Sequence, residues 1–187
     1  NIPQYITPNS YDAISLLAND AYDKFNGKMI AITGTAGKST SKNLLQMLLK
    51  HQFNVVATKG NHNTRTGVPL TIACAITQPD YLVVESAISG LWMNPHGIMK
   101  HYPPDVALIT SIEGGQTKNA FETAKLKAKI AEGMNNQGKV VINKDAKEFS
   151  TLINRVHQYN ENIVTYGWSK DANSYIEKYE EEKEYVR

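Results

Sequence analysis

Residues 33–40, with the sequence Thr-Gly-Thr-Ala-Gly-Lys-Ser-Thr, constrain the fold more than any other part of the chain. They follow an apolar run at residues 29–32 and precede a helical pattern, Leu44-Leu45 and Leu48-Leu49. A glycine-rich turn between a strand and a helix directs backbone N–H groups at one spot, where the helix N-terminus also favours anions. The sequence therefore predicts a phosphate-binding loop.

The side chains of this loop suit a nucleoside triphosphate. Lys38 can reach the terminal phosphates, and Ser39 offers a hydroxyl to a phosphate-bound Mg²⁺. The loop is shorter than the general pattern G-x-x-x-x-G-K-[ST], because Ile32 stands where the first glycine would be. An ordinary strand–helix turn with a surface lysine is the less favoured alternative. The nucleotide-binding residues predicted in the loop are Gly34, Thr35, Ala36, Gly37, Lys38, Ser39 and Thr40.

Length and charge exclude several classes of protein. A chain of 187 residues is long enough to bury a substantial core. Its 20 basic and 18 acidic residues give a net charge of +2. The chain therefore lacks the large excess of positive charge that would indicate nucleic acid as its partner. No apolar run approaches the length needed for membrane insertion. The single cysteine, Cys74, is expected to be a small core residue, and its isolation fits a reducing, cytoplasmic location.

Short apolar runs alternate with helical patterns along the chain, which predicts an α/β fold with a mostly parallel sheet and helices on both faces. A lead-in helix is expected at residues 10–25. From Asp171 onward the pattern fits either a hairpin or a charged helix. The predicted strands are residues 29–33, 54–57, 81–85, 106–110, 140–143 and 163–166. The predicted helices between them are residues 38–51, 66–76, 119–134 and 146–159.

Two polar features follow predicted strands, where ligands bind in sheets of this kind. Glu85 closes an apolar strand, and a carboxylate beside a triphosphate suits a magnesium ligand, with a solvated strand end as the less favoured alternative. Residues 60–71 form a run of amides and hydroxyls that can bond anionic or carbonyl groups. Within that run, Arg65 could contact a phosphate or carboxylate in a bidentate manner.

A lysine lies on the apolar side of one predicted helix. On a helical wheel of residues 119–134, Lys127 lies among Ala120, Ala124, Ala131 and Met134. Lys125, Lys129, Glu122 and Glu132 fall on the opposite side. A buried ammonium is costly and its pKa tends to fall, so Lys127 is expected to be a modified or catalytic lysine, with snorkelling to the surface as the alternative.

Taken together, these segments resemble the central ATP-binding domain of the Mur ligase family, the ATP-dependent amide-bond ligases of peptidoglycan assembly and their relatives. The family's loop reads T-G-T-x-G-K-[ST]-T, and its motif G-N-x-N-x-x-x-G-V-P-L-T matches residues 60–71. That form is most like the D-alanyl-D-alanine-adding member and the cyanophycin and poly-γ-glutamate synthetases. The family's strand-end glutamate matches Glu85, its carbamylated lysine matches Lys127, and its adenine-side L-N-x-D-D segment resembles residues 142–146. The resemblance covers about residues 28–168.

The resemblance implies ATP and Mg²⁺ as cofactors. A substrate carboxylate would attack the γ-phosphate to give an acyl phosphate, which the amine of an amino acid or peptide would convert to an amide. Lys38 and Lys127 would be the catalytic residues. Further nucleotide-binding residues would be Asn61, Asn63 and Asn143, and the metal-binding residues would be Ser39, Glu85, Lys127 and Gln116.

The chain departs from the family pattern at Gln116, where a histidine commonly helps to bind the second metal. An amide oxygen can also ligate Mg²⁺, and Glu113 is an alternative ligand. Two rival functions therefore stay open. The first is a different P-loop NTPase, which would explain Lys38 and Ser39 but not residues 60–71 or Lys127. The second is a non-catalytic nucleotide-binding homologue, and the replacement of the histidine by Gln116 is its best support.

The resemblance also implies a domain organisation. Residues 1–27 would be a lead-in helix and linker from an N-terminal domain, and residues 28–187 would be the central ATP-binding domain. The N-terminal and C-terminal domains of the same protein, which hold substrate and close over the ATP, would be its partners. The 187-residue chain by itself is then expected to bind nucleotide with little or no ligase turnover.

Overall fold

The computed structural model describes residues 6–92, 98–114, 117 and 119–179. Their strands form one sheet in the order β2-β3-β1-β4-β5-β6-β7, in which every adjacent pair is parallel. The predicted α/β class is therefore confirmed. The strands are β1 (Lys28–Thr33), β2 (Val55–Ala57), β3 (Tyr81–Glu85), β4 (Val106–Ile109), β5 (Lys139–Asn143), β6 (Ile163–Gly167) and β7 (Ser174–Tyr175).

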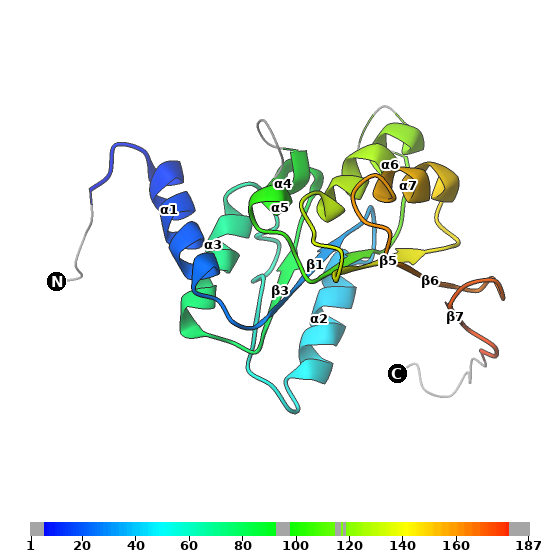
Figure 1. Cartoon of the computed structure of the whole chain (residues 1–187), viewed down its shortest axis with the longest axis horizontal. Coiled ribbons are helices and arrows are strands. Elements are labelled where there is room, and N and C mark those ends of the chain that lie inside the picture. The colour runs from blue at the N-terminus through cyan, green and yellow to red at the C-terminus, as the bar shows by residue number, and fades with distance from the viewer. Residues whose placement is uncertain (1–5, 93–97, 115–116, 118, 180–187) are drawn as a thin grey trace, which may run out of the picture.

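Helices cover both faces of the sheet, but unequally (Figure 1). The chain runs from β1 to β2 in one direction along the sheet and from β2 towards β6 in the other. Right-handed connections therefore place α2 on one face and α3 to α7 on the opposite face. The helices are α1 (Ser10–Asp23), α2 (Lys38–Leu49), α3 (Gly67–Ala73), α4 (Ile88–Trp92), α5 (Ile98–His101), α6 (Ala120–Ala128) and α7 (Phe149–Val156), with 3-10 turns η1 (Cys74–Thr77) and η2 (Lys129–Ala131).

Strand β1 lies between β3 and β4 and fixes the position of the site. Its register pairs Ile32 with Glu85 of β3 and Thr33 with Ile109 of β4. The last residues of β1 and β3 are buried without alternation, as expected for parallel strands covered on both faces. The carboxyl ends of three adjacent strands therefore open onto one edge of the sheet.

The strand predictions agree with the structure to within one residue at each end, whereas the helix predictions were too long. The predicted helix 66–76 is α3 followed by η1, and the predicted helix 146–159 begins only at Phe149. Within residues 171–179 the chain forms β7, a short strand parallel to β6, so neither the hairpin nor the charged helix is found there, and the rest of the predicted segment lies outside the described residues. The short helices α4 and α5 had no sequence signal.

The expectation that Cys74 is a core residue was wrong. Cys74 is exposed and follows Leu70, also exposed, by one helical turn. Val68, Ile72 and Ala75 occupy the buried side of this segment instead. Among the described residues, no helix has the length and apolar character required to span a bilayer.

Candidate functional site

The turn between β1 and α2 depends on two glycines. Gly34 has φ +155° and Gly37 has φ +80°, both in the region that L side chains rarely adopt. A Cβ at Gly34 would lie 1.9 Å from Thr110 Oγ1, so a side chain there would displace the end of β4. Gly37 is also the N-cap of α2, and no side chain of the described residues caps it. The first-turn N–H groups of α2 thus stay available to an anion.

Residues that follow β4 hold the loop in place. Ser111 accepts a hydrogen bond from Thr35 N at its carbonyl (2.9 Å) and another from Ala36 N at its Oγ (2.8 Å). Thr110 Oγ1 donates to Ala36 O at 2.6 Å. The backbone of the loop is therefore fixed by the neighbouring strand end before α2 begins.

Lys38 is the first residue of α2, and its side chain folds back over the loop. Its Nζ donates to Gly34 O (2.9 Å) and to Thr35 O (3.3 Å). The ammonium is thus held beside the glycine turn, where an anionic oxygen would receive a charge-assisted hydrogen bond from it. Ser39 and Thr40, the next two residues, are exposed.

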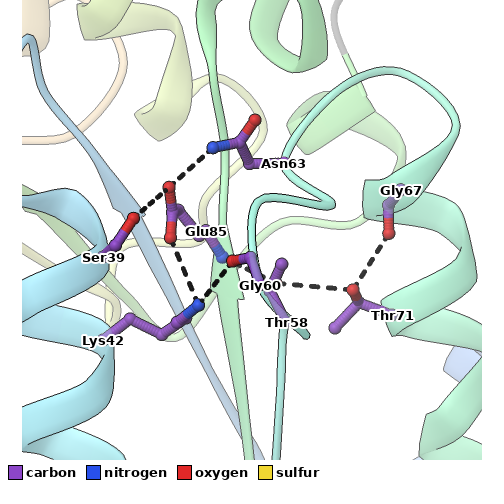
Figure 2. Close-up of polar contacts among 8 residues, drawn as sticks. All are labelled: Ser39, Lys42, Thr58, Gly60, Asn63, Gly67, Thr71 and Glu85. Atoms are coloured by element: carbon purple, nitrogen blue, oxygen red, sulfur yellow. Dashed lines mark hydrogen bonds and ion pairs between the residues drawn. The ribbon is translucent and has the colours of Figure 1, made fainter.

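The carboxylate of Glu85 is fully buried at the end of β3, next to the loop (Figure 2). Its Oε1 accepts hydrogen bonds from Ser39 Oγ (3.0 Å) and from Asn63 Nδ2 (2.6 Å). Its backbone N donates to Thr58 Oγ1 at 3.0 Å. The interpretation of Glu85 as a solvated strand end was therefore wrong, because the side chain joins α2, β3 and the loop after β2.

Lys42 is a site residue that sequence reasoning missed. It is 2% exposed, and its Nζ lies 3.4 Å from Glu85 Oε2 and donates to Gly60 O at 2.9 Å (Figure 2). Its spacing of four residues from Lys38 places both lysines on one side of α2. That spacing was the available signal.

The polar run at residues 60–71 contributes one inward amide to the site. Asn63 reaches Glu85, whereas the side chain of Asn61 is exposed. Arg65 lies with its guanidinium 4.3 Å from the ring centroid of Tyr11 in α1, so the structure directs it to that helix. A Cβ at Gly67 would lie 2.2 Å from His62 O, which explains a glycine at the start of α3.

Lys127 is fully buried in α6, as the helical wheel predicted. Its Nζ has no hydrogen-bond partner among the described residues. Burial, and to a smaller degree the positive charge of Lys38, lowers the pKa of Lys127 to about 7. Lys125 and Lys129 retain solvent access and lie 3.4 Å from Glu122 and 3.8 Å from Glu132. The snorkelling alternative was therefore wrong, while carbamylation of Lys127 stays a prediction.

Asn143, the last residue of β5, contacts Thr110, which holds the phosphate loop, and also lines a cavity. Its Nδ2 donates to Thr110 O (3.1 Å), and its Oδ1 accepts from Asp145 N (2.9 Å). The cavity has a volume of about 380 Å³ and includes Tyr166 and Trp168 in its walls. Aromatic walls of this kind suit a flat, uncharged ring.

The predicted second metal site lies only partly within the described residues. Gln116 lies outside the described residues. Glu113 is exposed, and its backbone N donates to Thr35 Oγ1 at 3.1 Å. In the described part of the chain, no group of three or more His, Cys, Asp and Glu side chains could hold a metal ion.

A glycine turn from an interior strand of a parallel sheet into a helix that begins with lysine and serine defines a P-loop nucleotide-binding α/β protein. The family is specified by comparison with known proteins. The model of the Mur ligase middle domain matches residues 32–186. The chain therefore belongs to the Mur ligase middle-domain family, as its motifs predicted.

The chain is similar to several UDP-N-acetylmuramoyl-tripeptide--D-alanyl-D-alanine ligases. It is 32% identical to the protein of Buchnera aphidicola subsp. Baizongia pistaciae over 155 residues, which are 80% of this chain and 33% of that protein. For the protein of Rickettsia prowazekii the identity is 26% over 174 residues, which are 89% and 38% of the two chains. The chain thus spans about a third of the length of these relatives.

Solved structures confirm the fold. The MurF ligase from Thermotoga maritima in complex with ADP has a TM-score of 0.68 and 27% identity, covering 90% of this chain and 40% of that one. A UDP-N-acetylmuramoylalanyl-D-glutamyl-2,6-diaminopimelate--D-alanyl-D-alanyl ligase from Acinetobacter baumannii has a TM-score of 0.79 and 20% identity, covering 92% and 38%.

The lowered pKa of Lys127 predicts a specific pH dependence of stability. Between pH 7 and the ordinary lysine pKa of 10.5, the unfolded chain binds a proton at Lys127 that the folded chain does not. The free energy of unfolding, relative to that of a Lys127→Met variant, should therefore rise with pH in this window by up to about 1.4 kcal/mol per pH unit. Below pH 7 the free-energy cost of burying the charged lysine is fully present and should no longer change with pH. Urea unfolding of both proteins across the window measures the difference.

The control for this measurement is Lys125→Met, which changes a solvent-accessible lysine two residues away. Its difference from the parent protein should stay constant with pH. Parallel stability curves for the parent and Lys127→Met would show that Lys127 stays protonated in the fold and would contradict the prediction.

Proposed function

We propose that this chain is the ATP-binding part of a ligase that joins a carboxylate to an amine. The observation that supports this best is the contact of buried Glu85 with Ser39 at the uncapped N-terminus of α2. A helix N-terminus and Lys38 attract phosphate, yet a carboxylate beside phosphate is repelled unless a cation lies between them. The arrangement therefore suits a nucleoside triphosphate bound together with a divalent ion.

The oxygen atoms at this point fit Mg²⁺. Ser39 offers a hydroxyl oxygen and Glu85 a carboxylate, which are the ligand types that this hard ion prefers. Glu85 Oε1 lies 3.0 Å from Ser39 Oγ, whereas Oε2 lies 3.4 Å from Lys42 Nζ, so Oε1 is the carboxylate oxygen that would share an ion with Ser39. Ser39 and Glu85 would hold the ion, which would neutralise charge on the phosphate oxygens.

The residues of the chain have separate tasks in this proposal. Lys38 and the first-turn N–H groups of α2 bind and orient the phosphates. Asn143 and the cavity beside Trp168 receive the nucleobase. Lys127, with a pKa near 7, is partly unprotonated at neutral pH, so its amine can add to CO₂ and release a proton to form a carbamate. The carbamate would convert a buried cation into an anion that can face a metal.

The proposed substrates are taken from the names of the relatives, which specify a UDP-N-acetylmuramoyl-tripeptide and D-alanyl-D-alanine. We infer a reaction in which the carboxylate of the first attacks the γ-phosphate of ATP, and the amine of the second displaces phosphate from the acyl phosphate. A reaction of this kind would belong to peptidoglycan precursor synthesis in the cytoplasm. Substrate recognition would lie largely in domains outside these 187 residues.

The test is an ADP-release assay on the full-length protein that contains this chain. ADP release should require ATP, Mg²⁺, the UDP-linked tripeptide and D-alanyl-D-alanine together. Release without the amine would indicate a P-loop NTPase of another kind. No release, in a protein that still binds ATP, would indicate a non-catalytic homologue.

Lys38→Ala should abolish nucleotide binding or weaken it by at least roughly 100-fold, because it removes the charge that faces the phosphates. The fold should be preserved, since the Lys38 ammonium contacts only loop carbonyls in the described structure. Calorimetric titration with a non-hydrolysable ATP analogue and Mg²⁺ measures the affinity. An unchanged affinity in a folded variant would refute the phosphate site.

Glu85→Gln should reduce nucleotide affinity only when Mg²⁺ is present. The amide keeps the size of the side chain and can still accept hydrogen bonds from Ser39 and Asn63, but it lacks the charge that holds the ion. Titrations with Mg²⁺ and with a chelator separate the two affinities. The same magnesium dependence in variant and parent would exclude Glu85 as a metal ligand.

A further inference from the structure

Lys42 is a buried lysine that the proposed function does not use. Its side chain is 3% exposed, although an ammonium removed from water requires compensation. The compensation comes from two groups in different segments. Nζ donates to Gly60 O (2.9 Å), after β2, and lies 3.4 Å from Glu85 Oε2, at the end of β3. Lys42 therefore ties α2 to both segments through one charged atom (Figure 2).

The two oxygens of Glu85 have different partners. Oε1 takes the hydrogen bonds of Ser39 and Asn63, whereas Oε2 faces the Lys42 ammonium without accepting a hydrogen bond from it. This division fixes the rotation of the carboxylate, with Oε1 directed to the serine of the phosphate loop. It also makes the buried Lys42 and Glu85 a pair with no net charge.

We propose that Lys42 is a positioning residue of the phosphate site and the internal counter-ion of Glu85. By offsetting part of the carboxylate charge from within the protein, it reduces the repulsion between Glu85 and a phosphate at α2, and the divalent ion of the proposed function offsets the rest. By holding Oε2, it keeps Oε1 beside Ser39. The part of this inference that concerns nucleotide rests on the proposed function, whereas the pairing of the two charges does not.

Removal of the Lys42 charge has a consequence opposite to that of Glu85→Gln. Lys42→Met keeps the aliphatic stem and leaves a buried, uncompensated carboxylate beside the phosphates. Nucleotide alone is then repelled, and a divalent cation takes over the compensation. Nucleotide binding should therefore become more dependent on Mg²⁺, whereas Glu85→Gln should make it less dependent.

The first measurement is a thermal unfolding cycle of the 187-residue chain without nucleotide. Lys42→Met should lower Tm by roughly 6–20 °C, because one member of a buried ion pair is removed. Glu85→Gln combined with Lys42→Met removes both charges and should recover at least half of that loss. Added Mg²⁺ should raise the Tm of Lys42→Met more than that of the parent, and should not do so in the double variant.

The second measurement is titration with a non-hydrolysable ATP analogue, with Mg²⁺ and with a chelator, at constant ionic strength. Lys42→Met should bind the metal-free analogue roughly tenfold more weakly than the parent does, and Mg²⁺ should restore most of the loss. The matched control is Lys50→Met, which changes an exposed lysine at the C-terminal end of the same helix and should match the parent in both experiments.

Three results would overturn the proposal. Additive effects of the two substitutions on Tm would show that Lys42 and Glu85 are not coupled. An equal loss of nucleotide affinity with and without Mg²⁺ would show a merely structural role for Lys42. If Lys42→Met does not fold, a folded double variant supports charge compensation and an unfolded one refutes it. Absence of nucleotide binding by the parent would refute the proposed function, while the unfolding cycle would still decide the pairing.

Discussion

The buried carboxylate of Glu85 is the contact on which the rest of the site depends. It joins the start of α2 through Ser39, the loop after β2 through Asn63, and the second turn of α2 through Lys42. Helix α2 follows β1, the loop follows β2 and the carboxylate ends β3, and only the parallel order of these strands brings all three to one edge. The sheet thus brings these segments together, and the hydrogen bonds and ion pair of the carboxylate fix the positions of their polar atoms.

Two buried lysines in this domain are accommodated by different physical means. Lys42 Nζ lies 3.4 Å from Glu85 Oε2, whereas Lys127 Nζ has no hydrogen-bond partner among the described residues and burial lowers the pKa of Lys127. The positive charge of Lys38 makes a smaller contribution to that lowering, because like charges repel each other. An anion bound beside Lys38 would reduce this repulsion.

The sequence was sufficient wherever the determining pattern is local. Continuous apolar runs located the strands, and the helical wheel identified the burial of Lys127. The sequence was insufficient where the burial of a residue depends on segments that come together only in the folded chain. Lys42 is covered because the loop at Gly60 and the end of β3 close over α2, and Cys74 is exposed because Val68 and Ile72 occupy the inner side of α3. Likewise, only the turn geometry decides that Asn63, rather than Asn61, points inward.

The hydrogen bonds from the loop to Ser111 have a consequence for the order in which the site forms during synthesis. Ala36 and its partner Ser111 are 75 residues apart, and β1 has no hairpin partner. A ribosome that has released β1 and α2 has therefore made the glycine turn but not the strand end that holds it. The hydrogen bonds that hold the turn therefore become available only once the chain extends past β4 to Ser111.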